Sequence, residues 1–225
     1  VERLVSLTNQ HLAIINYRVT PLNFSGEVTL VSTLDGAVTN QEETGDPRVG
    51  SPLQEQTLQL IEKKQEGNFG ALLQKTTNTE FSLVCGMENE LKTNSDFRLT
   101  TQQPDQQVKT IYNVNGQQDE EICLTKYITY YTSRDTIVDK LFTKATKNLK
   151  EAQSKGVSYF RQQQKDYLAD FWARADIKIK GDTALQQGLR FNAFHLLQSV
   201  GKDGQTNIAA KGLTGEGYEG HYFWD

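Results

Sequence analysis

The sequence has only four prolines and two cysteines in 225 residues, and it has no long apolar run. Without a run of about 18 apolar residues there is no candidate transmembrane helix, and Val1 does not open a signal-peptide pattern. Cys85 and Cys123 lack the spacing of a metal site, so we expect reduced thiols, with a single disulfide as the alternative. We therefore expect a cytoplasmic protein without a membrane partner.

Strong charge of either sign is also missing. The formal net charge is −4, and lysine and arginine are scattered along the chain, so no nucleic-acid partner is expected. His11, His195 and His221 are too far apart for metal-ligand spacing. A G-x-S-x-G nucleophile motif is absent as well. The sequence therefore predicts no metal and no bound cofactor.

Residues 1–132 carry the period-two pattern of β-strands. Strands are expected at 4–7, 12–19, 27–34, 58–63, 69–74, 80–87, 108–114 and 121–132. Residues 37–56 are polar, with two glycines and two prolines, which predicts a long irregular loop. Asn115-Gly116 lies between two strand patterns and predicts a type I′ hairpin. Many antiparallel strands without intervening helices indicate a β-sandwich.

From residue 135 the pattern changes to helical spacing. Helices are expected at 136–155, 158–173 and 182–201, with a short exposed strand at 176–180. Thr136 and Asp139 resemble a capping box at the start of the first helix, and Gly156 predicts its end. The third helix is apolar on most of its surface, so it must be covered on several sides within a larger helical body. His195 on this helix is interpreted as a core histidine.

The segment 210–225 combines four glycines with aromatic rings and carboxylates. Rings stack on the C–H faces of a sugar and carboxylates accept hydrogen bonds from its hydroxyls, so this composition favours a carbohydrate subsite. Gly215 to Gly220 spells G-x-G-x-x-G, but a dinucleotide site also needs a strand before it and a helix after it, and the sequence predicts neither. Glu216 and Glu219 are interpreted as solvent-facing or backbone-capping groups, with one half of an acid–base pair as the alternative.

The stretch from Gly212 to Asp225 resembles the first barrel loop of glycoside hydrolase family 65, the inverting α-glucoside phosphorylases that act on maltose, trehalose, kojibiose or nigerose. Other segments also resemble this family, in the family's order: 3–12 and 20–26 in its sandwich, 130–135 at the sandwich exit, and 185–192 in the first barrel helix.

This resemblance implies a mixed β and α multidomain fold. Residues 1–134 would be part of an N-terminal β super-sandwich, residues 135–175 a helical linker, and residues 176–225 the first helix and loop of an (α/α)6 catalytic barrel. Further sandwich strands would precede Val1 and most of the barrel would follow Asp225, so an internal segment of a longer protein is expected.

The same resemblance implies how a sugar is held. Trp224 would pack on the glucosyl unit in the −1 subsite, and Asp225 would accept hydrogen bonds from its distal hydroxyls. Phe223 and His221 would shape the same wall. No catalytic residue is expected in this chain, because the general acid would be a glutamate downstream of Asp225.

Phosphorolysis of an α-linked disaccharide to β-glucose 1-phosphate and glucose is the implied reaction. Inorganic phosphate is the co-substrate and attacks directly, so the base carboxylate of an inverting hydrolase is dispensable. Dimers are common in this family, so a homodimer is one option for an oligomeric state that the sequence leaves open. The chain alone is expected to be inactive.

Two alternatives stay open. The first is a hydrolase of the acid-trehalase type, which needs a second carboxylate to activate water. The second is a non-catalytic β-sandwich carbohydrate-binding module. A bare sandwich does not need the apolar third helix or the pair Trp224-Asp225, which argues against that module.

Overall fold

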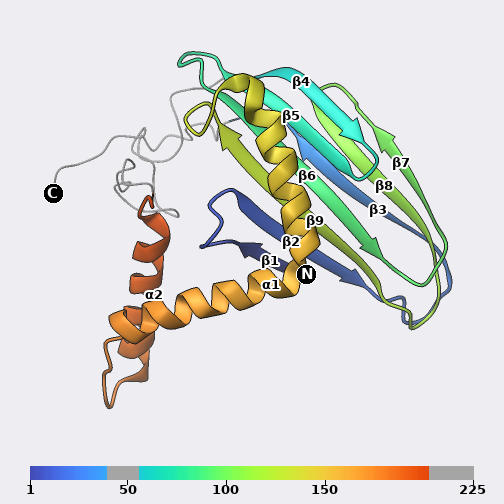
Figure 1. Ribbon diagram of the computed structural model, residues 1–225. Coiled ribbons are helices and arrows are strands. Elements are labelled where there is room, and N and C mark those ends of the chain that lie inside the picture. Colours follow the sequence, from blue (N-terminus) through green and yellow to red (C-terminus); the bar gives the residue numbers. More distant parts are fainter. Residues whose placement is uncertain (40–55, 203–225) are drawn as a thin grey trace, which may run out of the picture. The chain divides into compact units, whose positions relative to one another are not determined.

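A computed structural model describes residues 1–39 and 56–202 of the chain (Figure 1). The chain divides into two compact units, Val1–Val38 with Thr57–Asp166, and Thr39–Gln56 with Tyr167–Asp225. The described strands are β1 (Glu2–Val5), β2 (Leu12–Val19), β3 (Gly26–Asp35), β4 (Leu58–Glu66), β5 (Phe69–Thr76), β6 (Ser82–Lys92), β7 (Phe97–Gln102), β8 (Gln107–Gly116) and β9 (Ile122–Thr132). The helices are η1 (Val138–Lys140), α1 (Leu141–Ala175) and α2 (Thr183–Ser199).

The first unit contains the β-sandwich that the sequence predicts. One sheet has the strand order β1-β2-β9-β6-β5-β4, the other has β3-β8-β7, and all the pairings are antiparallel. Apolar side chains from both sheets fill the space between them in two clusters. One cluster includes Tyr112 and Ile122, and the other includes Met87 and Val108. The fold class expected from the sequence, a sandwich followed by long helices, is confirmed.

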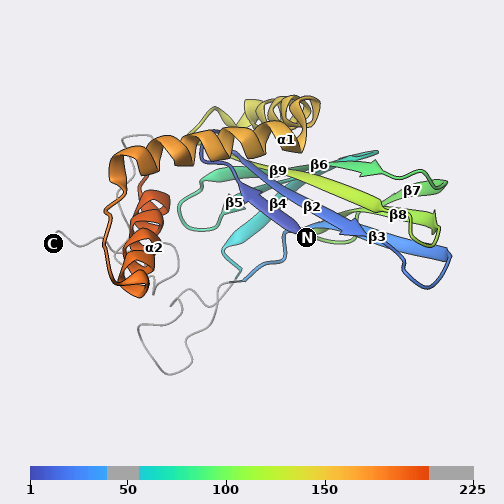
Figure 2. The same cartoon turned by 90° about the horizontal axis from the view of Figure 1, so that it is seen from below.

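The other face of the six-stranded sheet is covered by the first part of α1 (Figure 2). Leu149 packs in a cluster with Tyr127 of β9, and Ala145 packs in a cluster with Val84 of β6. Gly86 permits this approach, because a Cβ atom there would lie 3.2 Å from Leu149 Cδ1. The sheet therefore has a core on each side, which explains why most residues of β5 and β6 are buried.

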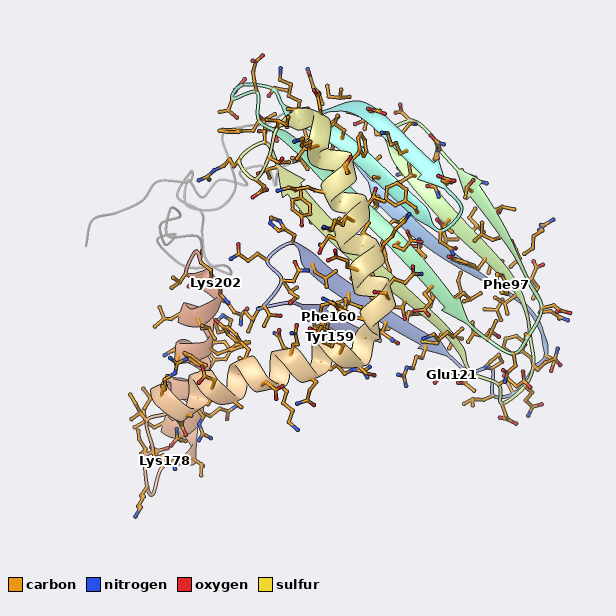
Figure 3. All side chains as sticks on the ribbon, in the orientation of Figure 1. Phe97, Glu121, Tyr159, Phe160, Lys178 and Lys202 are labelled. Atoms are coloured by element: carbon orange, nitrogen blue, oxygen red, sulfur yellow. The ribbon has the colours of Figure 1, made fainter. Side chains whose placement is uncertain are left out.

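Gly156 interrupts α1, as the sequence predicts. Its backbone has φ 75° and ψ 165°, a left-handed conformation that strains any residue with a Cβ atom. Phe160, labelled in Figure 3 beside Tyr159, follows the break and returns to the cluster that contains Leu149. The helix therefore changes direction at Gly156 while both of its segments stay in contact with the same sheet.

The predicted hairpin at Asn115-Gly116 is wrong. Strand β8 pairs with β3 and β7, whereas β9 pairs with β2 and β6, so the two strands belong to different sheets. Gly116 is still within β8, opposite Gly26, and the turn comes later, where Asp119 has φ 64°. The chain crosses between the sheets here. Alternating apolar residues look the same whether the next strand pairs with the first or faces it, so the pattern could not distinguish the two.

Strand β7 is absent from the sequence-based prediction. It is an edge strand paired only with β8 among the described strands, and none of its residues is buried. An exposed edge strand does not need an apolar face, so it leaves little periodic signal. The loop predicted at 37–56 lies mostly outside the described residues, and its described ends have no regular structure.

Two local predictions near the helices are also wrong. The capping box predicted for Thr136 and Asp139 does not form, because the residue that precedes η1 is Ile137 and no side chain caps this helix. Residues 176–180 are not a strand. The side chain of Gln186 forms hydrogen bonds with the backbone of this segment. It accepts from the N–H of Ile179 and donates to the carbonyl of Ile177, both at 2.8 Å.

The described part of the second unit contains the end of α1 and helix α2. Asp182 caps α2 by accepting from the N–H of Leu185 at 2.9 Å, which confirms the predicted start. None of the residues of α2 is buried among the described residues, and Phe191 and Leu196 are each 61% exposed. His195 contacts the rings of Phe191 and Phe194 rather than lying in a core.

Replacing Leu149 by alanine is expected to lower the free energy of unfolding by about 2–5 kcal/mol, because the side chain is fully buried against the sheet. Urea unfolding followed by circular dichroism would measure the change. The matched control is Lys147→Ala on the solvent face of the same turn, for which a change within about 0.5 kcal/mol is expected. Equal losses in the two variants would contradict the packing of α1 on the sheet.

Candidate functional site

The residues predicted to contact a sugar lie outside the described part of the chain. These are His221, Phe223, Trp224 and Asp225, and the same holds for Glu216 and Glu219 of the preceding loop. Their arrangement is therefore not described, and their roles stay predictions.

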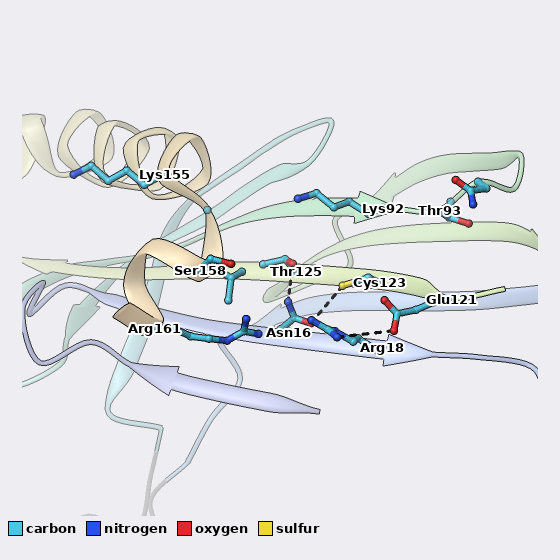
Figure 4. Close-up of a pocket in the computed structure, with 13 residues that line it drawn as sticks. Asn16, Arg18, Lys92, Thr93, Glu121, Cys123, Thr125, Lys155, Ser158 and Arg161 are labelled. Atoms are coloured by element: carbon cyan, nitrogen blue, oxygen red, sulfur yellow. Dashed lines mark hydrogen bonds and ion pairs between the residues drawn. The ribbon is translucent and has the colours of Figure 1, made fainter. Parts of the chain in front are cut away.

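A cavity of about 470 Å³ with a polar lining lies among the described residues of the first unit (Figure 4). It lies where α1 turns at Gly156, so that the face of the six-stranded sheet extends beyond the helix. Strands β2 and β9 form its floor, the end of β6 and the segment after it form one side, and residues 155–161 of α1 form the other. We call it the kink cavity.

Asn16 is the centre of the floor of the kink cavity. It is only 6% exposed and lies opposite Thr125 in the pairing of β2 with β9. Its amide nitrogen donates to Thr125 Oγ1 at 3.4 Å, and its carbonyl oxygen accepts from Arg18 Nε and Cys123 Sγ, both at 3.3 Å. Both polar atoms of the buried amide are thus satisfied, which holds the floor in one arrangement.

The polar floor of the cavity lies on the same sheet face as the apolar surface under α1. Earlier on β2 the same face carries Leu12 and Ile14, which pack in the cluster under α1, whereas Asn16 and Arg18 follow in the cavity. On β9, Tyr127 lies under the helix, and the cavity begins two residues before it. The composition of one sheet face therefore changes where the cover of the helix ends.

Arg161 and Glu2 form an ion pair at one side of the cavity. The guanidinium of Arg161 donates two hydrogen bonds to the two carboxylate oxygens of Glu2, and each side chain is about 40% exposed. This hydrogen bonding lowers the pKa of Glu2 below its ordinary value, against a smaller opposing effect of burial. The pair joins β1 to the second segment of α1.

Two further cations of the rim are also paired. Arg18 lies 4.0 Å from the Glu121 carboxylate, and Lys92 lies 3.1 Å from Glu90. With the pair Glu2–Arg161, each of these three cations at the cavity has a carboxylate partner. These three pairs therefore place donors and acceptors side by side at the rim, and Lys155 adds a fourth cation, whose ammonium lies over the ring of Tyr159.

Two other hollows occur in the described residues. One, of about 450 Å³, is lined by β2, β3 and β9, and contains Lys126. The Lys126 ammonium donates to the carbonyl of Thr33 at 2.6 Å, and burial lowers its pKa. The other, of about 220 Å³, lies in the second unit beside Asp176, which accepts two hydrogen bonds from Arg190.

The two thiols are free in the structure, with Cys85 buried and Cys123 partly buried. Within residues 1–39 and 56–202, no three histidine, cysteine, aspartate or glutamate side chains gather as a metal site would require. In the same residues, no helix combines the length and the apolar character that crossing a membrane would take.

Comparison with known families decides the classification. The model described as "Glycosyl hydrolase family 65, N-terminal domain" matches residues 1–171. The chain belongs to glycoside hydrolase family 65. The model of the central catalytic domain of family 65 matches residues 190–225, which include the loop with Trp224 and Asp225.

Individual members of family 65 match along the whole chain. The α,α-trehalose phosphorylase of Thermoanaerobacter brockii is 45% identical over 225 residues, which are 100% of this chain and 29% of that protein. The maltose phosphorylase of Bacillus subtilis (strain 168) is 33% identical over 232 residues, 100% of this chain and 28% of that protein. The family 65 chain thus spans less than a third of the length of these relatives.

A solved structure shows the same fold. It comes from the human microbiome and is described as a kojibiose phosphorylase; it matches with a TM-score of 0.84 and 24% identity, over 99% of this chain and 28% of the other. The resemblance to family 65 that the sequence predicts is confirmed.

Sequence reasoning missed the kink cavity, although two signals were present. One is the change from Leu12 and Ile14 to Asn16 and Arg18 at period two along β2. The other is Gly156, interpreted only as the end of a helix. Neither signal shows that the two features lie next to each other, because they are 140 residues apart in the sequence.

Glu2→Gln is expected to remove a pH-dependent contribution to stability. Because the folded pKa of Glu2 is lowered, the contribution is present above the unfolded pKa and is lost as the pH falls through the folded value. At pH 7 the free energy of unfolding, measured in urea, should be higher for the wild type than for the variant. The difference should be at most about 1 kcal/mol, because both side chains of the pair are partly exposed. The difference should shrink as the pH falls below about 4.

Arg161→Gln supplies the control for this measurement. In that background Glu2→Gln should have no further effect at pH 7, because the partner that lowers the pKa is gone. A stability difference between wild type and Glu2→Gln that persisted unchanged at low pH would contradict the assignment.

Proposed function

We propose that the protein carrying this chain is an inverting disaccharide phosphorylase. It cleaves an α-glucoside with inorganic phosphate and releases β-glucose 1-phosphate and glucose. The observation that carries the proposal is the 45% identity along the whole chain to the α,α-trehalose phosphorylase of Thermoanaerobacter brockii. The identity to the maltose phosphorylase of Bacillus subtilis supports the same class of reaction. Because the chain spans under a third of either relative, the activity is proposed for the whole protein.

Substrate contacts are assigned to the segment 221–225, within the part that the catalytic-domain model matches. Trp224 stacks on the glucosyl ring of the −1 subsite, Asp225 accepts hydrogen bonds from its hydroxyls, and Phe223 and His221 complete the wall. A site built to bond a hydroxyl rejects analogues that lack it, because its own polar groups would be left unpaired. Specificity for a glucosyl unit therefore rests on Asp225.

The general acid is assigned to a glutamate that follows Asp225 in the family's order. It protonates the leaving sugar oxygen while phosphate attacks the anomeric carbon from the opposite face, so inversion gives a β-phosphate from an α-glucoside. The proposal needs no metal or organic cofactor. We also propose a cytoplasmic location, because free thiols such as these two persist in a reducing compartment. The proposed assembly is a homodimer.

Asp225→Asn and Trp224→Ala in the full-length protein should each lower kcat/KM by about two orders of magnitude, because they remove a charged acceptor and a stacking surface at the reacting sugar. The matched control is Glu216→Gln in the same loop, which should keep most of the activity because Glu216 is interpreted as facing solvent or backbone. Initial rates of sugar 1-phosphate release would measure both. Full activity of Asp225→Asn would refute the assignment of the subsite.

The reaction class is tested with trehalose, maltose and kojibiose, with and without phosphate. Phosphate-dependent β-glucose 1-phosphate, identified by its anomeric NMR signal, supports phosphorolysis. Glucose release without phosphate would instead identify the acid-trehalase type of hydrolase. Residues 1–225 alone should turn over none of these sugars, and turnover by them would overturn the placement of the general acid. No cleavage by the full-length protein, with sugar binding retained, would favour the non-catalytic module.

A further inference from the structure

We propose that the kink cavity is a second ligand site, which binds an uncharged saccharide of one or two rings. Its described lining comes wholly from residues of the first unit. The inference rests on the described geometry of the first unit and does not depend on the proposed function.

Size and shape are the first observation. The cavity has a volume of about 470 Å³. Sites for small molecules usually enclose about 300–1,000 Å³, so this volume suits a small ligand rather than a protein segment. The floor is built from two central strands and its hydrogen bonds are made without a ligand, so the site is largely preformed. A preformed site avoids much of the entropic cost of binding.

The balance of charge selects the class of ligand. Arg18, Lys92 and Arg161 each have a carboxylate within ion-pair distance. The Lys155 ammonium lies over the ring of Tyr159, 5.2 Å from its centre. A phosphate or carboxylate ligand would compete with the carboxylates already bound to these three cations. An uncharged ligand can bind without breaking any of these pairs.

The arrangement of donors and acceptors points to hydroxyl groups. The Arg18 guanidinium only donates and the adjacent Glu121 carboxylate only accepts, and the two lie 4.0 Å apart. Neighbouring hydroxyls of a sugar both donate and accept, so a pair of them can bridge such a pair of side chains. Asn94 and Ser158 add an amide and a hydroxyl to the lining, and Val157 adds an apolar surface for the C–H groups.

Cys123 supplies a local probe of this site. Its thiol lines the cavity and is partly buried, whereas Cys85 lies in the core between the sheets. Alkylation by iodoacetamide, followed by peptide mass spectrometry of the full chain, would therefore report occupancy of the cavity alone. The alkylation rate of Cys85 is the internal reference, because it would change only if the sugar altered how often the whole fold opens.

Glucose, trehalose or maltose should slow the alkylation of Cys123 without changing that of Cys85. At ten times the dissociation constant the rate should fall about tenfold, by simple competition. Inorganic phosphate and glucose 1-phosphate serve as anionic probes. Glycerol at the same concentration controls for effects on the solvent.

Ser158→Trp is designed to fill the mouth of the cavity from an exposed helical position. It should abolish the dependence of the rate on sugar, whereas Ser154→Trp, one turn earlier and outside the lining, should keep it. Arg18→Gln should weaken sugar binding about fivefold or more by removing a charged donor. Arg98→Gln, an exposed arginine on β7, is its control and should leave binding unchanged.

The proposal is supported by sugar-dependent protection that Ser158→Trp removes and Ser154→Trp keeps. It is overturned if Cys123 reacts no faster than Cys85 in the free protein, if no sugar protects it, or if phosphate protects it and neutral sugars do not. Protection that survives Ser158→Trp also overturns it. Phosphorolysis is measured separately, so failure of either proposal leaves the other intact.

Discussion

Leu149 packs against Gly86 at the face of the six-stranded sheet, and the rest of the first unit depends on this contact. The helix lies close to the sheet here because Gly86 has no side chain: a Cβ atom added at this position would lie 3.2 Å from Leu149 Cδ1, so its neighbours would have to shift. The close approach covers the second face of the sheet. As a result, residues of β5, β6 and β9 are buried on both sides, and the sandwich has two cores rather than one.

The break at Gly156 then determines which part of that face stays open. Before it, α1 covers apolar positions of β2 and β9; beyond it, the same strands present Asn16, Thr125 and Cys123 to a cavity. Asn16 forms hydrogen bonds with Thr125 and Cys123 on this floor. The polar composition of the floor and the change in helix direction are thus two parts of one arrangement, and this consistency gives the cavity the character of a built feature.

Membership of family 65 and the described structure bear on different parts of the molecule. The sandwich and the helix that packs on it are described in atomic detail, and they support the inference of a saccharide site in the first unit. The residues assigned to the glucosyl subsite lie in the segment matched by the catalytic-domain model. Their proposed roles rest on the loop sequence and on relatives whose names specify phosphorolysis of α-glucosides. A protein with both sites would hold sugars through two unlike surfaces, one aromatic and one built of paired charges.

The sequence by itself determined the elements whose signal is local. Period two located most of the strands, the cap of Asp182 located the start of α2, and the glycine at 156 located the break in α1. It also determined the family, because the segment 212–225 and four other segments resemble family 65 in the family's order. The roles of Trp224 and Asp225 were predicted from the same resemblance, and they remain predictions.

Only the tertiary structure decided which strand pairs with which. Alternation records that a strand has a buried face but not what covers it, so the passage through Asn115-Gly116 was taken for a hairpin when it joins two sheets. The edge strand β7 buries no face and left no pattern to find. The kink cavity needed Asn16, Glu121 and Arg161 to meet across more than a hundred residues of sequence. Contacts of that range are set by packing and register, which no local preference encodes.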